Sequence, residues 1–183
     1  MKRASLVDFF SRYRLILLNA LMFQLGWLVC ILFGSLYALI FTVAASLFHF
    51  WLFGNQRADW LYASIALFMG LLHDSLMLAT GVFGFAGHFL PPVWLLCLWW
   101  LLGLTLRHSL YEIYRRPLLA SLLGAVSAGF AYYAGVSLSP ISWGTLGEAG
   151  VLIIAAAWLV VLPLHRRVCA LLEINYTRTE PHD

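Results

Sequence analysis

The sequence predicts an all-α membrane protein: a bundle of six transmembrane helices with a short interfacial helix in front of it. Of the 183 residues, 63% are hydrophobic and only 10% are charged. A soluble domain has about 25% charged residues, so this chain has too few charges to cover a water-facing surface. Its apolar residues also fall into six runs, each close to the roughly 20 residues that cross a bilayer. The length leaves no room for a second large domain.

The chain divides into three parts. Residues 1–14 are basic and amphipathic, which favours a helix on the membrane surface. A signal peptide is the alternative, but no small-residue cleavage site ends the first apolar run, and more apolar runs follow at once. The membrane domain is predicted at residues 15–168, and residues 169–183 form a cytoplasmic tail that we expect to be disordered from Glu173. The six spans are Leu15–Phe33, Leu36–Phe53, Trp60–Thr80, Val93–Leu110, Leu118–Val136 and Glu148–Leu164.

The connections between the spans are short or irregular. Only Gly34 and Ser35 separate the first two spans, which predicts a tight hairpin, because one helix of about 39 apolar residues would far exceed the bilayer. Gly54–Asp59 is a polar turn. Gly81–Pro92 contains three glycines and two prolines, so it is not helical; we expect an apolar loop on the membrane surface or dipping into it.

The positive charges predict the orientation. If the N-terminus lies inside, every Lys and Arg falls on the inner segments and the three outer connections have none. Positively charged residues concentrate on the cytoplasmic side of membrane proteins. The chain is therefore predicted to lie in a bacterial inner membrane with both termini in the cytoplasm. An odd number of spans would destroy this pattern.

Several function classes are not indicated. The chain has no Gly-rich phosphate loop, no long basic run for nucleic acid, and no internal repeat of the kind found in inverted-repeat transporters. The three scattered cysteines, Cys30, Cys97 and Cys169, are expected to be buried thiols rather than disulfides or zinc ligands. We expect no cofactor and no metal.

The third span contains His73 and Asp74 well inside its apolar run. A carboxylate at that depth costs about 2.5–3.5 kcal/mol on insertion scales, so Asp74 is expected to face the bundle interior, in a polar pocket open toward the outer leaflet. Gly70, on the same helical face, permits a neighbour to approach closely. Three interpretations remain open: a neutral acid hydrogen-bonded between helices, a ligand or proton site, and a metal ligand. The candidate partners of Asp74 are Tyr132 or Tyr133, Ser75 and His88.

A second polar group is predicted in the inner half of the bundle. It comprises Asn19, Gln24, His49, Thr105 and His108, although His108 alone would also suit the membrane interface. The serines beside the histidines do not face them on a helix, so no Ser–His pair forms locally. His108 lies roughly 15 Å from Asp74 along the membrane normal, too far for one metal to bridge them.

The fifth span has a stripe of small residues on one face. Its members are Ala120, Gly124, Ala128, Ala131 and Gly135. Such faces let membrane helices pack closely, so this helix is predicted to lie in the bundle centre.

These motifs, taken in order, resemble a small proteobacterial inner-membrane family known only as a domain of unknown function. The resemblance rests on Asn19, Phe23–Trp27, Cys30, Gly70–Leu76, Pro92, Trp94, Thr105–Leu110, Gly124, Gly129, Tyr132 and Gly135. Genes of that family often lie near genes for cyclopropane-fatty-acid-synthase-like and other lipid-modifying enzymes, which implies a link to membrane lipids. The family has no assigned reaction, so no catalytic residue follows from the resemblance. The near-absent loop after the first span departs from the family pattern. The Gly70–Asp74 segment is also similar to the cell-shape protein MreD and to small substrate-binding subunits of vitamin transporters.

Three functional hypotheses follow. The leading one is a protein that binds a membrane lipid or a small apolar ligand, or that is accessory to lipid-modifying enzymes. The second is an intramembrane enzyme that acts on lipid, with Asp74 or His108 as acid or base. The third is a structural partner of other membrane proteins. The predicted ligand-binding residues are Asp74, His73, Gln24, Asn19, Thr105, His108 and Tyr132.

Overall fold

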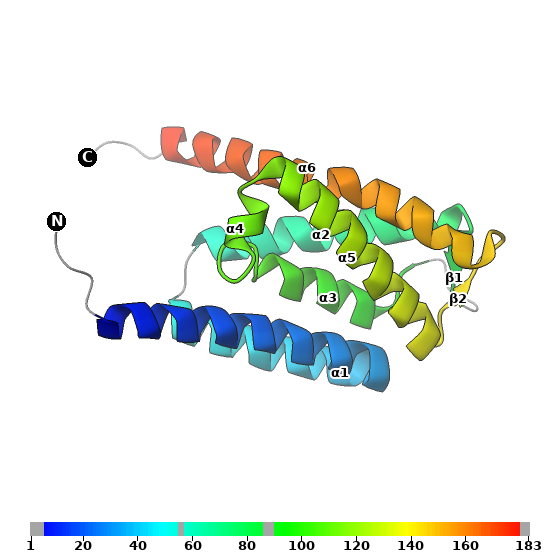
Figure 1. The fold of residues 1–183 in the computed structure, drawn as a ribbon, viewed down its shortest axis with the longest axis horizontal. Coiled ribbons are helices and arrows are strands. Elements are labelled where there is room, and N and C mark those ends of the chain that lie inside the picture. The colour runs from blue at the N-terminus through cyan, green and yellow to red at the C-terminus, as the bar shows by residue number, and fades with distance from the viewer. Residues whose placement is uncertain (1–5, 55–56, 86–89, 180–183) are drawn as a thin grey trace.

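The computed structural model describes residues 6–54, 57–85 and 90–179 and is almost entirely helical. Its helices run roughly along one direction, and both ends of the chain lie at the same end of the molecule (Figure 1). The elements in chain order are α1 (Leu6–Phe53), α2 (Arg57–Ala79), β1 (Phe83–Gly84), α3 (Val93–Gly103), α4 (Tyr111–Tyr114), α5 (Pro117–Leu138), β2 (Ser142–Trp143), the 3-10 helix η1 (Gly147–Ala149) and α6 (Gly150–Thr179).

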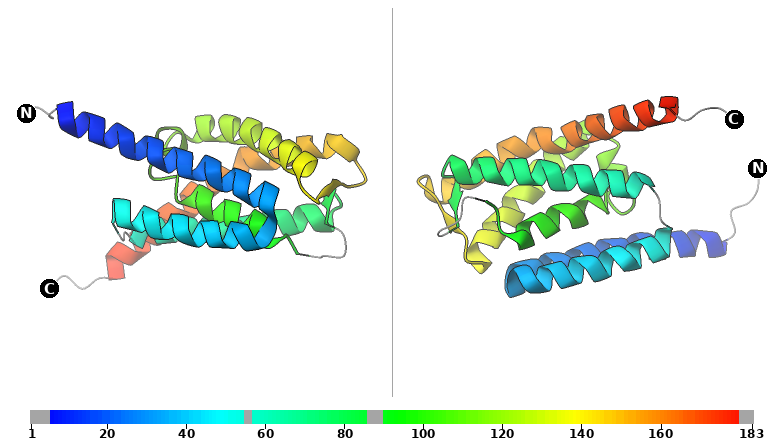
Figure 2. Two further views of the ribbon diagram at one scale, coloured as in Figure 1. Left: turned by 90° about the horizontal axis from the view of Figure 1, so that it is seen from below. Right: turned by 180° about the vertical axis from the view of Figure 1, so that it is seen from behind.

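Element α1 is a helical hairpin. Gly34 has φ 74° and ψ −171°, outside the helical region. A positive φ of this kind is accessible to glycine and strained for other residues. The chain reverses there, and the two halves of α1 lie side by side (Figure 2). The turn that the sequence predicts at Gly34 is therefore present.

The number of membrane-crossing helices differs from the prediction. Four helical segments of the described chain are long and apolar enough to cross a membrane, not six: Tyr13–Phe53, Arg57–Ala79, Pro117–Leu138 and Gly147–Glu173. The first of these contains both of the first two predicted spans. The predicted fourth span, Val93–Leu110, is helical only over the 11 residues of α3. That length covers about 16 Å, roughly half of a bilayer's hydrocarbon core.

Two further boundaries differ from the sequence prediction. The expected interfacial helix is not separate, because α1 continues without a break from Leu6 through Arg14 into the apolar run. No glycine or proline lies there to end the helix. At the other end, α6 passes Pro163 and Glu173 and ends only at Thr179, so the described part of the expected disordered tail is helical.

Two loops pair at the end of the molecule opposite the termini. Phe83 and Gly84 of β1 pair antiparallel with Trp143 and Ser142 of β2. The predicted Gly81–Pro92 loop is thus joined, through residues 83 and 84, to the segment that follows α5. Residues 86–89, which include the predicted partner His88, lie outside the described part of the chain.

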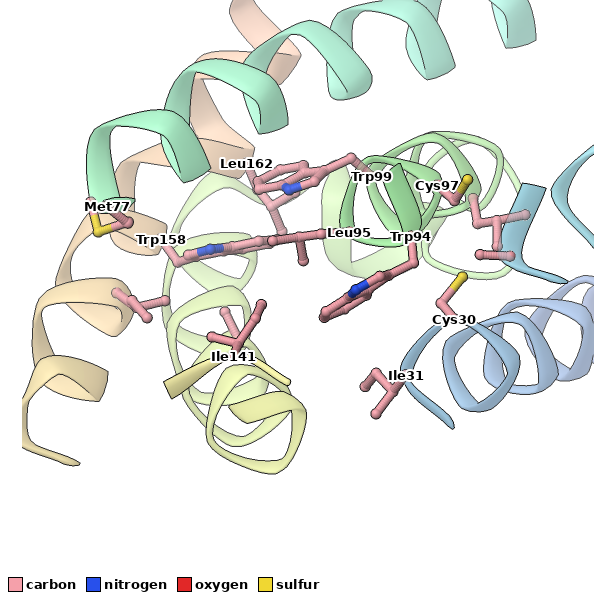
Figure 3. Close-up of a cluster of buried hydrophobic side chains, with 14 of the residues drawn as sticks. Cys30, Ile31, Met77, Trp94, Leu95, Cys97, Trp99, Ile141, Trp158 and Leu162 are labelled. Atoms are coloured by element: carbon pink, nitrogen blue, oxygen red, sulfur yellow. The ribbon is translucent and has the colours of Figure 1, made fainter. Parts of the chain in front are cut away.

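The core is centred on α3, which packs against both α1 and α2, while α5 packs along α6. Trp94 and Trp99 of α3 lie near Trp158 of α6 (Figure 3). All three cysteines are buried and free, as predicted. Many large apolar side chains face outward instead, for example Phe130 and Leu152. An apolar exterior over long apolar helices is the pattern of a protein surrounded by lipid.

Candidate functional site

A long groove of about 710 Å³ runs between the first half of α1 and α5, with α3 as its floor. Its walls are almost entirely apolar. The polar side chains that reach it are Gln24, Thr105, Ser109, Ser127 and Tyr132, together with four indoles, those of Trp27, Trp94, Trp99 and Trp158. On α1 and α3 the lining residues repeat every three or four positions, so each of these helices contributes one face. The small residues of α5, among them Gly124 and Ala128, line the groove.

Asp74 lies beside the groove and is completely buried. Its carboxyl group accepts three hydrogen bonds. Tyr132 Oη donates to Oδ1 at 2.6 Å, Trp99 Nε1 donates to Oδ2 at 2.7 Å, and His73 Nδ1 lies 2.7 Å from Oδ1. All three contacts are of hydrogen-bond length, so both carboxyl oxygens have partners. The four residues, together with Trp158, form what we call the Asp74 cluster.

The structure confirms part of the prediction for Asp74 and corrects another part. The carboxyl group faces the bundle interior and is bonded to Tyr132, as expected. It does not line a polar pocket open to the outer leaflet, because aromatic side chains enclose it. Gly70 has the predicted role: a Cβ atom there would fall within 2.3 Å of the Trp99 ring, so only glycine leaves the indole room to reach Asp74.

Sequence analysis missed Trp99 and Trp158 in this cluster. The signal for Trp99 was Gly70, one turn before Asp74, because the space that a glycine leaves on a buried helical face can be filled by a large side chain from a neighbouring helix. Adjacent residues on a helix point about 100° apart, so the sequence does not predict a contact between the side chains of His73 and Asp74. In the structure the two side chains nevertheless meet. Tyr133, the other predicted tyrosine, is 42% exposed, and no hydrogen bond joins it to Asp74 in the described structure.

Two buried nitrogens of the Asp74 cluster have no hydrogen-bond partner among the described residues. They are Nε2 of His73 and Nε1 of Trp158, whose ring centroids lie 6.3 Å apart; the indole N–H lies near Tyr132 Oη but does not form a hydrogen bond of good geometry with it. When His73 is neutral and donates from Nδ1 to Asp74 Oδ1, the second ring nitrogen, Nε2, carries a lone pair. Trp158 Nε1 can only donate. An acceptor and a donor are thus both left unsatisfied in one cluster.

A second buried cluster lies near the chain ends and is centred on Asp59, which the sequence placed in a polar turn. Its carboxylate is bound by Arg107 Nη1 at 2.7 Å from Oδ1, by His108 Nε2 at 3.2 Å from both oxygens, and by His49 Nε2 at 3.3 Å from Oδ2. Asn19 Nδ2 in turn lies 3.4 Å from His49 Nδ1. We call Asn19, His49, Asp59, Arg107 and His108 the inner polar cluster. Asp59 and Asp74 are 15 residues apart on α2, about 22 Å at 1.5 Å per residue, so the two clusters are separate.

Nitrogen and oxygen atoms of His49, Asp59 and His108 lie within 4.8 Å of one another, a spacing that one metal ion could bridge. The hydrogen bonds favour a different arrangement. Asn19 Oδ1 accepts from the Ser109 backbone N–H and hydroxyl, so Asn19 Nδ2 faces the Leu104 carbonyl and His49 Nδ1. His49 Nδ1 is then an acceptor, and the ring proton is on Nε2, directed at Asp59. In this arrangement His49 Nε2 would have to release its proton before it could bind a metal ion.

The other predicted site residues are distributed over both regions. Asn19, His49 and His108 meet in the inner polar cluster, whereas Gln24 and Thr105 line the groove. The Thr105 hydroxyl donates to the Leu102 carbonyl. In the inner polar cluster the sequence analysis missed Asp59 and its partner Arg107. The position of Asp59 at the same predicted membrane level as Arg107 and His108 was a usable signal, because a buried carboxylate needs such donors.

The fold and its two buried polar clusters define a multi-pass α-helical membrane protein. Comparison with known families then places it: residues 16–164 match the family described as "Protein of unknown function (DUF2878)", and the chain belongs to that family. The predicted membership of a family of unknown function is thereby confirmed; the proteobacterial origin and the gene neighbourhood stay predictions. No match was found among curated proteins or among solved structures.

Proposed function

We propose that this protein binds a membrane lipid or a small apolar ligand in the groove between α1 and α5. The observation that carries the proposal is the groove itself: about 710 Å³, with walls built from three helical faces that are almost wholly apolar. Ligand sites in proteins typically measure about 300–1,000 Å³ and are lined mainly by apolar side chains with a few polar groups.

The surroundings of the groove support an apolar occupant. The outward faces of the helices are apolar, so a ligand can reach the groove from the hydrocarbon core of the bilayer without crossing water. An acyl chain in the groove would be in van der Waals contact with its apolar side chains. An accessory role beside lipid-modifying enzymes, which would act on or supply such a ligand, is compatible with this proposal.

We also propose six crossings with both termini in the cytoplasm of a bacterial inner membrane. The fold-back at Gly34 supports two crossings by α1, and α3 with the turns up to Leu110 would make the fourth. The two chain ends lie at one end of the molecule, as an even number of crossings requires (Figure 1). At that end Arg107 binds Asp59 in the first turn of α2, in keeping with the concentration of positive charge on the cytoplasmic side (Figure 1).

A groove-filling substitution tests ligand binding. Ala131 of α5 lines the groove, whereas Val126 on the same helix is 57% exposed on the outer face. Ala131→Phe is expected to reduce the lipid retained by gently purified protein several-fold, and Val126→Phe is expected to retain the wild-type amount. Native mass spectrometry with lipid identification measures both. Equal lipid content in the two variants would contradict the proposal and favour a purely structural partner of other membrane proteins.

An intramembrane enzyme is the second candidate, and the pairing of His73 with Asp74 favours it. Asp74 already accepts hydrogen bonds on both oxygens, whereas His73 Nε2 has no partner among the described residues, so in the neutral ring Nε2 is the atom with a lone pair to act as a base. A lipid turnover that is lost in Asp74→Asn, in protein that still folds, would establish this function. Full turnover in that variant would refute a catalytic role for the pair.

A further inference from the structure

The Asp74 cluster contains an unexplained defect in its hydrogen bonding. His73 Nε2 and Trp158 Nε1 are buried and have no partner among the described residues, although the rest of the cluster is well bonded. The His73 side chain is only 7% exposed. A buried polar atom without a partner is costly, and such atoms in a native protein call for an explanation such as a catalytic role, a water or a ligand.

The two unsatisfied atoms are complementary. In the neutral imidazole with its proton on Nδ1 toward Asp74, His73 Nε2 accepts a hydrogen bond, and Trp158 Nε1 donates one. A hydroxyl group can donate to the first and accept from the second. An ammonium group has no acceptor and an ionised carboxylate has no donor, so neither satisfies both atoms.

The cluster also adjoins the groove. Trp99, Tyr132 and Trp158 belong both to the groove wall and to the Asp74 cluster, and His73 packs against all three rings. Trp99 and Trp158 stack with their ring centroids 4.9 Å apart. A polar group at the end of an apolar chain in the groove can therefore contact Trp99, Tyr132 and Trp158, which separate the groove from His73.

We propose that His73 and Trp158 recognise the hydroxyl group of an apolar ligand whose chain lies in the groove. This inference rests on the proposed function. Asp74 is a positioning residue: it fixes the ring orientation and tautomer of His73, and Tyr132 and Trp99 in turn fix Asp74. A water molecule can also donate to His73 Nε2 and accept from Trp158 Nε1, so the experiment must distinguish a ligand hydroxyl from a water molecule.

Two radiolabelled probes of equal chain length separate the groove from the hydroxyl site. Purified protein in detergent is titrated with 1-hexadecanol and, separately, with hexadecane. Hexadecane reports on the groove alone, and the ratio of the two dissociation constants reports on the hydroxyl site. The wild type is expected to bind 1-hexadecanol about tenfold more tightly, the ratio that about 1.4 kcal/mol produces.

Variants assign the preference to the two side chains. His73→Phe and Trp158→Phe are each expected to bring the ratio close to one, whatever their effect on hexadecane binding. His73→Gln, which keeps an acceptor near the position of Nε2, is expected to restore part of the ratio. Trp27→Phe, which removes another indole from the groove wall, is the matched control and is expected to keep the wild-type ratio.

The outcomes are distinguishable. Binding of hexadecane with a wild-type ratio near one would overturn the hydroxyl site and leave the groove proposal standing. Absence of binding by both probes would overturn both. A structure with 1-hexadecanol in which a water bonds to both nitrogens, and the alcohol oxygen lies elsewhere, would show that water alone fills the site and would overturn this inference.

Discussion

Replacing Asp74 tests how the buried carboxylate is stabilised. Its two oxygens accept from three donors: Tyr132 and His73 on Oδ1, and Trp99 on Oδ2. In Asp74→Asn one oxygen is replaced by an NH₂ group. If the remaining oxygen serves Tyr132 and His73, the NH₂ group faces the N–H of Trp99, and one hydrogen bond becomes a donor–donor contact. A buried donor without a partner costs about 1–3 kcal/mol.

Asp74→Leu removes all three acceptor contacts at similar volume. Three buried donors then lack a partner, and the loss is expected to be about 3–6 kcal/mol, less than three full penalties because neighbouring effects do not add. Natural domains are stable by only about 5–15 kcal/mol, so the Leu variant should be severely destabilised. The expected order of stability is wild type, then Asn, then Leu.

Thermal unfolding in detergent, followed by circular dichroism, measures this order. Ser75→Ala, one residue along the same helix, is the control and is expected to unfold at the wild-type temperature. A Leu variant as stable as the wild type would refute the reasoning, because it would show that the three donors have other partners. An Asn variant as stable as the wild type would indicate that the carboxyl is a neutral hydrogen-bonding group.

Three further predictions concern packing, topology and metal. Gly124→Leu should destabilise the protein by about 1–3 kcal/mol, because a Cβ atom at Gly124 already lies 3.0 Å from Leu162, whereas Leu122→Ala on the exposed face should cost about 0.5 kcal/mol or less; equal unfolding temperatures would show that the stripe is not close-packed. A cysteine introduced at Ser142 should react with a membrane-impermeant thiol reagent added to intact cells, and one at Arg57 should not; the reverse labelling would invert the proposed orientation. Removal of divalent metals with a chelator should leave the unfolding temperature unchanged, because hydrogen bonds hold the inner polar cluster; a loss of stability that zinc or iron restores would instead establish a metal site there.

The sequence by itself determined the class of the protein and several local features. Too few charges to cover a water-facing surface required a membrane protein. The Gly34 turn followed from two long apolar runs with no other break between them, and the positive φ that it needs is local to one residue. The interior position of Asp74 followed from the cost of a carboxylate in lipid, which holds whichever residues enclose it.

Only the tertiary structure decided which residues meet. Asp59 is bound by residues 10, 48 and 49 positions away, which no local pattern connects to it. The sequence also could not show that α3 ends at Gly103, because the apolar run continues to Leu106, and the turns that follow place Arg107 and His108 against Asp59. The groove has the same origin: its volume is the space left where α1 packs on α3 and α5 packs on α6, and such a space depends on helix packing, which amino-acid composition does not encode.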